Sequence, residues 1–245
     1  MYGTNPSGIS STTSDYSSFQ MSGRIAASGD VTTLLTRNGT TQVTHSHCFA
    51  HLFDGCTSLT TAPALPATTL RMACYESMFN GCTALTAAPA LPATTLTVSC
   101  YAAMFQGCTS LTAAPALPAT TLAVYCYQRM FKGCTSLTNV PSELPATTLE
   151  SVCYDSMFQG CTSLTTAPAL PATTLATMCY YSMFQGCTSL ASITCLAEDI
   201  SALSCTNNWL QNVSASGTFT KSANMSGWPT GDNGIPSGWT VVDAS

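Results

Sequence analysis

Apolar and polar positions along this chain follow one cycle that returns every 26 residues, with a single step of 27 at Ser142 and Glu143. In each cycle a Gly-Cys-Thr-Ser-Leu string opens the stretch Leu-Thr-Thr-Ala-Pro-Ala-Leu, which runs on into Pro-Ala-Thr-Thr-Leu. The first string or a close variant begins at Gly55, Gly81, Gly107, Gly133, Gly160 and Gly186. Such self-similarity is typical of repeat proteins, in which each unit forms one coil of a stack.

Each cycle predicts three local structures. The stretch before the first proline favours an extended segment, because proline disfavours helix in the residue that precedes it. Pro66 and its equivalents then predict a turn through Ala-Thr-Thr. The next segment has apolar residues four, eight and nine positions after the first, as from Leu175 to Phe184. That spacing predicts a short helix with one buried stripe, and Gly186 supplies the left-handed residue that would end it.

Stacked coils place identical residues above one another, about 4.7–4.9 Å apart where strands pair. We therefore predict inward ladders of leucine and phenylalanine, with methionine beside them, and an outward ladder of threonine. The inward residues are Leu59, Leu85, Leu111, Leu137, Leu164, Leu190, Phe53, Phe79, Phe105, Phe131, Phe158, Phe184, Met78, Met104, Met130, Met157 and Met183. The outward residues are Thr60, Thr86, Thr112, Thr138 and Thr165. Because a helix in each coil would curve this face, we interpret the threonines as wetting rather than as an ice-binding array.

The predicted fold class is an α/β solenoid, a right-handed leucine-rich-repeat-like stack with a short strand on one side and a short helix on the other. Residues 43–213 make about six to seven coils. Residues 1–42 are rich in Ser, Thr and Gly, carry no repeat and predict an N-terminal cap. Residues 214–245 predict a C-terminal cap of two short strands joined by a turn around 231–234. Trp209 and Leu210 continue the methionine and phenylalanine positions one coil further.

The repeat motif resembles the BspA-like leucine-rich repeat proteins of anaerobic bacteria. The resemblance lies in Leu-x-x-Ala-Pro-x-Leu-Pro and Cys-Tyr-x-x-Met-Phe-x-Gly-Cys-x-Ser-Leu, and it covers roughly residues 43–213. The segments from Met21 to Leu35 and from Gly217 to Val241 are similar to the caps of such arrays. The resemblance implies a curved solenoid, on a bacterial surface or secreted, that serves adhesion or protein binding. It implies no catalytic residue.

Composition narrows the classes of partner. Apolar residues make up 45% of the chain and charged residues 7%, against about a quarter in a typical globular domain. The net charge is −5 and the six Lys and Arg residues are scattered, so no basic stripe favours a nucleic-acid partner. No apolar run approaches the roughly 20 residues of a membrane span, and membrane insertion is not expected.

The fourteen cysteines fall mainly into two series that lie eight residues apart within a cycle. Two interpretations stay open: buried free thiols that pack as small apolar groups, or local disulfides such as Cys74 with Cys82. Cys195 has no counterpart in other coils. We predict that both series form structural ladders along the stack. Their members in the repeated coils are Cys74, Cys82, Cys100, Cys108, Cys126, Cys134, Cys153, Cys161, Cys179 and Cys187.

The sequence points to no catalytic, metal or cofactor site. His47 and His51 would share one face of a helix, but Cys48 belongs to the buried series and only Asp54 offers a nearby carboxylate. We interpret this group as exposed histidines on the first coil rather than as a metal site. The three histidines lie near one end of the chain, the eleven acidic residues are mostly isolated, and no phosphate-binding glycine motif occurs.

Side chains that differ between otherwise near-identical coils are expected to face solvent. They either vary neutrally on an exposed helix or form a surface that contacts a partner. The candidate ligand-binding residues are Glu76, Gln128, Arg129, Lys132, Asp155 and Tyr181. The function we favour is non-enzymatic binding or adhesion to a protein or glycan, at the cell surface or after secretion. A phage virion module for receptor binding or decoration, and a structural spacer, are the alternatives. The first residues show no signal peptide, and their abrupt start favours a shortened chain.

Overall fold

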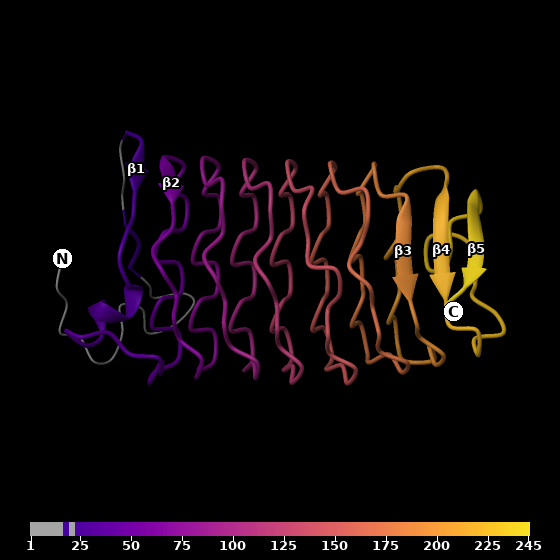
Figure 1. The fold of residues 1–245 in the computed structure, drawn as a ribbon, viewed down its shortest axis with the longest axis horizontal. Coiled ribbons are helices and arrows are strands. Elements are labelled where there is room, and N and C mark those ends of the chain that lie inside the picture. Colours follow the sequence, from indigo (N-terminus) through magenta and orange to yellow (C-terminus); the bar gives the residue numbers. More distant parts are fainter. Residues whose placement is uncertain (1–16, 20–22) are drawn as a thin grey trace.

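The computed structural model describes residues 17–19 and 23–245, which form a row of coils stacked side by side from the N-terminal to the C-terminal end (Figure 1). The described elements are β1 (Ile25–Ala26), a 3-10 turn η1 (Val31–Leu34), β2 (Leu59–Thr61), β3 (Ser192–Cys195), β4 (Gly217–Lys221) and β5 (Trp239–Asp243). β1 pairs with β2, and β3, β4 and β5 form a second sheet in that order. Every pairing is parallel, because each strand belongs to a different coil.

The extended side of the middle coils is paired only at single points. Bridges such as Ala113 with Asn139 and Thr95 with Thr121 join neighbouring coils in parallel. Each coil from Leu59 to Pro171 carries two prolines in this region, for example Pro63 and Pro66, and a proline has no N–H to give to a ladder. The predicted extended segment is present, but the prolines keep it from becoming a continuous sheet.

The predicted helix is wrong: the described residues contain no α-helix, and the segment is a ribbon of overlapping turns. The N–H groups of Cys74 and Glu76 donate to the carbonyls three residues before them, at 3.2 Å each. The N–H groups of the residues that alternate with these point out of the coil and donate to carbonyls of the next coil, as from Tyr75 to Cys100 at 3.1 Å. Every fourth residue has a left-handed backbone, and the φ angles of Ala73 and Ser77 are both 52°.

The hydrogen bonds between coils explain why a ribbon replaces the helix. Packed helices lie 8–10 Å apart, whereas paired strands lie about 4.8 Å apart, so a helix on one side would open the stack into a curve. The ribbon donates backbone hydrogen bonds to its neighbour just as the extended side does, and both sides keep the same spacing. The stack is accordingly straight, not curved as the resemblance implied (Figure 1). In the sequence, the ribbon corresponds to apolar residues that recur every four positions rather than every 3.6.

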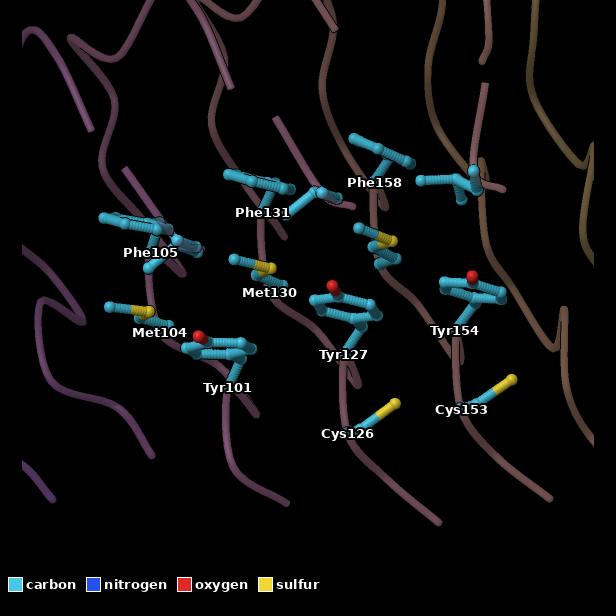
Figure 2. Packing of buried hydrophobic residues seen from close by; sticks show 14 of the residues in the cluster. Tyr101, Met104, Phe105, Cys126, Tyr127, Met130, Phe131, Cys153, Tyr154 and Phe158 are labelled. Atoms are coloured by element: carbon cyan, nitrogen blue, oxygen red, sulfur yellow. The ribbon is translucent and has the colours of Figure 1, made fainter. Parts of the chain in front are cut away.

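The core consists of columns of identical side chains (Figure 2). The predicted leucine, phenylalanine and methionine series are buried in every repeated coil. The phenylalanine rings stack with centroids 5.4 Å apart at Phe53–Phe79 and 5.6 Å apart at Phe158–Phe184. A second aromatic column was not predicted: Tyr75, Tyr101, Tyr127, Tyr154 and Tyr180 are also buried and stacked. Each ring covers the next, so the apolar surface of a coil is buried only by its neighbours.

Both ends of the stack are covered. At the N-terminal end Phe19 extends the phenylalanine column onto Phe53, with ring centroids 5.3 Å apart. Within the predicted cap of residues 1–42, β1 pairs with β2, and residues 1–16 and 20–22 lie outside the described residues. At the C-terminal end β4 and β5 add two strands beyond β3, as predicted in number. Since they are parallel, residues 222–238 form a crossover rather than a tight hairpin, and they fold over Trp209, whose Nε1 donates to the carbonyl of Gly234 at 2.8 Å.

Candidate binding surface

The outer side of the turn ribbon, here called the ribbon face, carries the residues that differ between coils. Of the six predicted ligand-binding residues, Arg129 is exposed, and Glu76, Gln128, Lys132 and Tyr181 are half-buried. Gln128, Arg129 and Lys132 share one coil. Glu76 lies two coils before them and Tyr181 two coils after. The ribbon therefore places these five side chains along one face of the stack, although they are separated by up to 105 positions in sequence.

The expectation that Asp155 faces solvent is wrong, because its side chain is only 5% exposed. Its Oδ2 accepts a hydrogen bond from Nε2 of Gln128 in the preceding coil at 2.8 Å, and its Oδ1 accepts one from the hydroxyl of Ser156 at 2.6 Å. Coils stacked this closely cover short outward side chains, and Ser182 at a neighbouring variable position is also buried. Asp155 consequently holds Gln128 in place instead of offering a free carboxylate.

A polar column runs along the ribbon face at the position before each glycine. Nδ2 of Asn80 donates to Oδ1 of Asp54 at 2.9 Å. Further along, Gln159 donates to Gln185, and Gln185 donates to Gln211. Amide columns of this kind also occur where identical chains stack in register. These bonds fix the side chains of Asp54 and Asn80 and those from Gln159 to Gln211, so these parts of the ribbon face are pre-organised.

An exposed apolar group that sequence reasoning missed borders the ribbon face. Met72, Val98 and Tyr125 are 45%, 41% and 40% exposed, and they occupy three successive coils just before the buried cysteines. We call these three residues the apolar corner. Contiguous exposed apolar residues commonly mark interaction sites. The sequence did contain an indication that Met72 is exposed. Later coils have Ser151 and Thr177 at its position, so the core does not require an apolar residue there.

The cysteines are buried free thiols in all fourteen cases. The series that follows each glycine has a structural role, because its thiols donate to phenylalanine carbonyls one coil back, as from Cys108 to Phe79 at 3.1 Å. Burial raises the pKa of Cys126 and of Cys134 to about 12, with smaller opposing effects from backbone hydrogen bonds. Since the thiolate is the reactive form, these side chains are poor nucleophiles and poor metal ligands near neutral pH.

One histidine of the group on the first coil is hydrogen-bonded to a neighbouring carboxyl group. Nδ1 of His51 lies 2.7 Å from Oδ2 of Asp54. The pKa of nearby Glu76 is raised by burial, with a smaller lowering by His51. The predicted helical arrangement of His47 and His51 is absent, because both lie at left-handed positions of the ribbon. Within residues 17–19 and 23–245, no three His, Cys, Asp or Glu side chains are arranged to hold a metal ion.

Comparisons with protein-family models, with curated proteins and with solved structures gave no match. Among the described residues there is also no helix with the length and apolar character needed to cross a bilayer. What the surface offers chemically is a rigid array of amides, a few cations and an apolar corner. These groups suit non-covalent contact with a partner.

Proposed function

We propose that the protein binds a protein or glycan partner through the ribbon face and the apolar corner, without catalysing a reaction. The observation that carries this proposal is the contrast between an unchanging backbone and changing outward side chains. Where Ala102 stands in one coil, Gln128 and Tyr181 stand in others, while the buried columns beneath them stay the same. A fixed scaffold with varied side chains suits a broad and shallow contact.

The composition of the surface supports a mixed polar and apolar contact. The apolar corner supplies Met72, Val98 and Tyr125, and aromatic side chains are enriched where partners bind. Arg129 and Lys132 lie on the ribbon face of the coil that also carries Tyr125, and they supply positive charge in a chain with net charge −5. Because the backbone is hydrogen-bonded from coil to coil, a partner would lose little affinity to ordering of this surface.

We further propose that the coil stack belongs with the leucine-rich-repeat-like solenoids of the BspA-like type, displayed at a cell surface or secreted. Support comes from the Cys-Tyr-x-x-Met-Phe-x-Gly-Cys motif and from the stacked leucine, cysteine and aromatic columns. The turn ribbon and the straight axis are departures from that type, and they make this chain a variant whose described coils contain no α-helix.

A binding screen with matched variants tests the proposal. The purified chain is immobilised and probed with a glycan array and with extracellular matrix proteins. Replacing both Val98 and Tyr125 by serine should weaken binding of any identified partner at least tenfold. Leu203→Ser is the control, because Leu203 is 73% exposed but lies on a distant coil. Absence of any partner, or binding that neither Val98→Ser/Tyr125→Ser nor Arg129→Ala weakens, would refute the proposal.

A structural spacer is the second candidate, favoured by the straight axis of the stack (Figure 1). A spacer needs constant length and rigidity but no particular outward side chain. Adding one coil distinguishes the two roles. A spacer function depends on the length of the stack, whereas partner binding at the apolar corner should not change. Small-angle scattering of the lengthened chain, combined with the binding assay, makes the comparison.

A further inference from the structure

Two columns of exposed threonines run along the stack, just before the turn ribbon of each coil. The pair Thr-Thr follows a buried alanine and precedes a buried leucine in five successive coils, and all ten of its side chains are exposed. The ten residues are Thr68, Thr69, Thr94, Thr95, Thr120, Thr121, Thr147, Thr148, Thr173 and Thr174. We call them the threonine strip.

The backbone of the strip does not require threonine. The N–H groups of Thr120 and Thr121 both donate to one carbonyl of the preceding coil, at 3.1 and 3.4 Å. Glu198 and Asp199 occupy the same place in the last coil, and their N–H groups make the same two bonds at 2.7 and 3.0 Å. Exposed positions on the ribbon face change from coil to coil, whereas this exposed pair is repeated five times. The repetition therefore points to a role of the threonine side chains themselves.

The hydroxyl groups of the strip are available to water. Within residues 17–19 and 23–245, Thr68 is the one member of the strip whose hydroxyl bonds to protein, and it donates to the carbonyl of Thr41 at 3.5 Å. Between two neighbouring coils the strip contains a shallow depression of about 340 Å³, lined by residues 147–149 and 173–176. Its lining is threonine, leucine and alanine, without a charged or aromatic side chain. The strip thus offers water a regular set of hydroxyl groups beside methyl groups.

The strip is straight and its spacing is uniform. Parallel bridges join coils at the strip, as at Thr95 with Thr121, so equivalent threonines of successive coils lie about 4.7–4.9 Å apart. In the core, the five stacked ring pairs from Phe53 to Phe184 are within 10° of parallel, so neighbouring coils have nearly the same orientation. The curvature that a helix in each coil would cause is absent (Figure 1). The reason for treating exposed threonines here as simple wetting is thereby removed.

The spacing of the strip is close to a spacing in ice, where each water molecule makes its hydrogen bonds tetrahedrally. With an O···O distance of about 2.75 Å, two oxygen atoms bonded to the same water lie about 4.5 Å apart. The strip differs from this by about 0.3 Å per coil, or about 1.2 Å over its whole length, which is less than half of one hydrogen bond. We propose that the threonine strip binds ice, with the hydroxyl groups of successive coils at oxygen positions of the ice surface.

This activity goes beyond partner binding at the ribbon face and uses a different part of each coil. Neither proposal depends on the other. Each coil adds few hydrogen bonds to the ice surface, so adhesion needs several neighbouring coils in register. A bulky charged side chain in the middle of the strip should consequently disrupt binding along its whole length.

Ice affinity and thermal hysteresis test the proposal. Ice is grown slowly in a solution of the purified chain, and the protein concentration in the ice is compared with that in the remaining liquid. The gap between the melting and freezing temperatures is measured separately. We expect enrichment in the ice and a gap that widens with protein concentration. A chain that is excluded from ice and shows no gap would overturn the proposal.

Matched variants locate the binding surface, and circular dichroism shows that each is folded. Thr95→Lys/Thr121→Lys should reduce the hysteresis by more than half, and Thr95→Ser/Thr121→Ser, which removes only two methyl groups, should also reduce it. Thr83→Lys/Thr109→Lys is the control, because these exposed threonines lie in the same two repeats outside the strip. Equal loss in the control, or full hysteresis in both strip variants, would overturn the proposal. Arg129→Ala should leave the hysteresis unchanged, so that a failure of ribbon-face binding is recognised separately.

Discussion

Two adjacent alanines offer a test of the turn ribbon, because they have the same side chain but different backbones. Ala103 has a left-handed backbone with φ of 52°, and Ala102 is not among the left-handed residues. An L-residue in the left-handed region costs about 1–2 kcal/mol, which glycine avoids. Glycine in turn costs about 0.5–1 kcal/mol in backbone entropy. Ala103→Gly should therefore be neutral or raise the free energy of unfolding by about 1 kcal/mol.

The neighbouring substitution should have the opposite sign. Ala102→Gly relieves no backbone strain, has the same cost in backbone entropy, and removes the methyl group of a residue that is 5% exposed. Loss of that burial adds about 0.8 kcal/mol, so the free energy of unfolding should fall by about 1–2 kcal/mol. In a helix, by contrast, both substitutions would cost about 1 kcal/mol. The difference between the two variants is thus the quantity that separates ribbon from helix.

Urea and thermal unfolding of the two variants, followed by circular dichroism, measure that difference. For a chain of this size each kcal/mol moves the Tm by about 2–4 °C, so the two midpoints should lie about 4–8 °C apart with Ala103→Gly the higher. Equal losses of stability in both variants would refute the ribbon and restore the helix. A far-ultraviolet spectrum with strong helical minima would lead to the same conclusion.

Four further predictions concern the core and the repeat. Burial raises the pKa of Cys126 and Cys134 from 9.0 to about 12, so above pH 9 these thiols lose their protons in the unfolded chain first. Their contribution to the free energy of unfolding is full below pH 9 and should fall as the pH rises toward 12, by up to about 1.4 kcal/mol per pH unit for each thiol. Urea titrations at pH 8 to 10 measure this fall. Thiol counts in denaturant should be equal with and without reductant, and native thiols should react slowly; a lower count without reductant would contradict free cysteines. Phe131→Ala should cost about 3–5 kcal/mol in equilibrium unfolding, against less than about 0.5 kcal/mol for exposed Thr135→Ala. Deleting residues 101–126, one full coil, should leave a cooperatively folded chain by near-ultraviolet dichroism, whereas deleting half a coil should not.

The columns of the core could be predicted from the sequence, because a repeat in a stack needs only a period and an apolar pattern. Leu111 and Leu137 are both buried and one coil apart, as the repeat requires. The ribbon could not be predicted in the same way. A residue such as Tyr75 gives no local indication that its N–H will leave its own segment, since that depends on how closely the next coil approaches. Only the apolar period of four distinguished the ribbon from a helix.

The candidate surface was predicted less well than the core. Variation between coils correctly marked Arg129 as exposed, but it also selected Asp155, which is buried under a neighbouring coil. Variation shows that a position tolerates different side chains, not that water reaches it. Met72, Val98 and Tyr125 were missed because an apolar residue in an apolar-rich repeat is assumed to be internal. The crossover of residues 222–238 lies outside the repeat, where no period guides prediction.

The direction of the ribbon's hydrogen bonds gives the two ends of the molecule opposite electrical character. Within the turn ribbon, from Phe49 to Phe184, the N–H groups that leave a coil point toward the following one, so their peptide dipoles add along the axis as they do in a helix. Partial positive charge accumulates at the C-terminal end, where Oδ1 of Asn233 accepts the N–H of Asn208 at 2.8 Å. Partial negative charge accumulates at the other end. Two such molecules meeting end to end should consequently attract when head meets tail and repel when like ends meet, so any filament they form should have a single polarity.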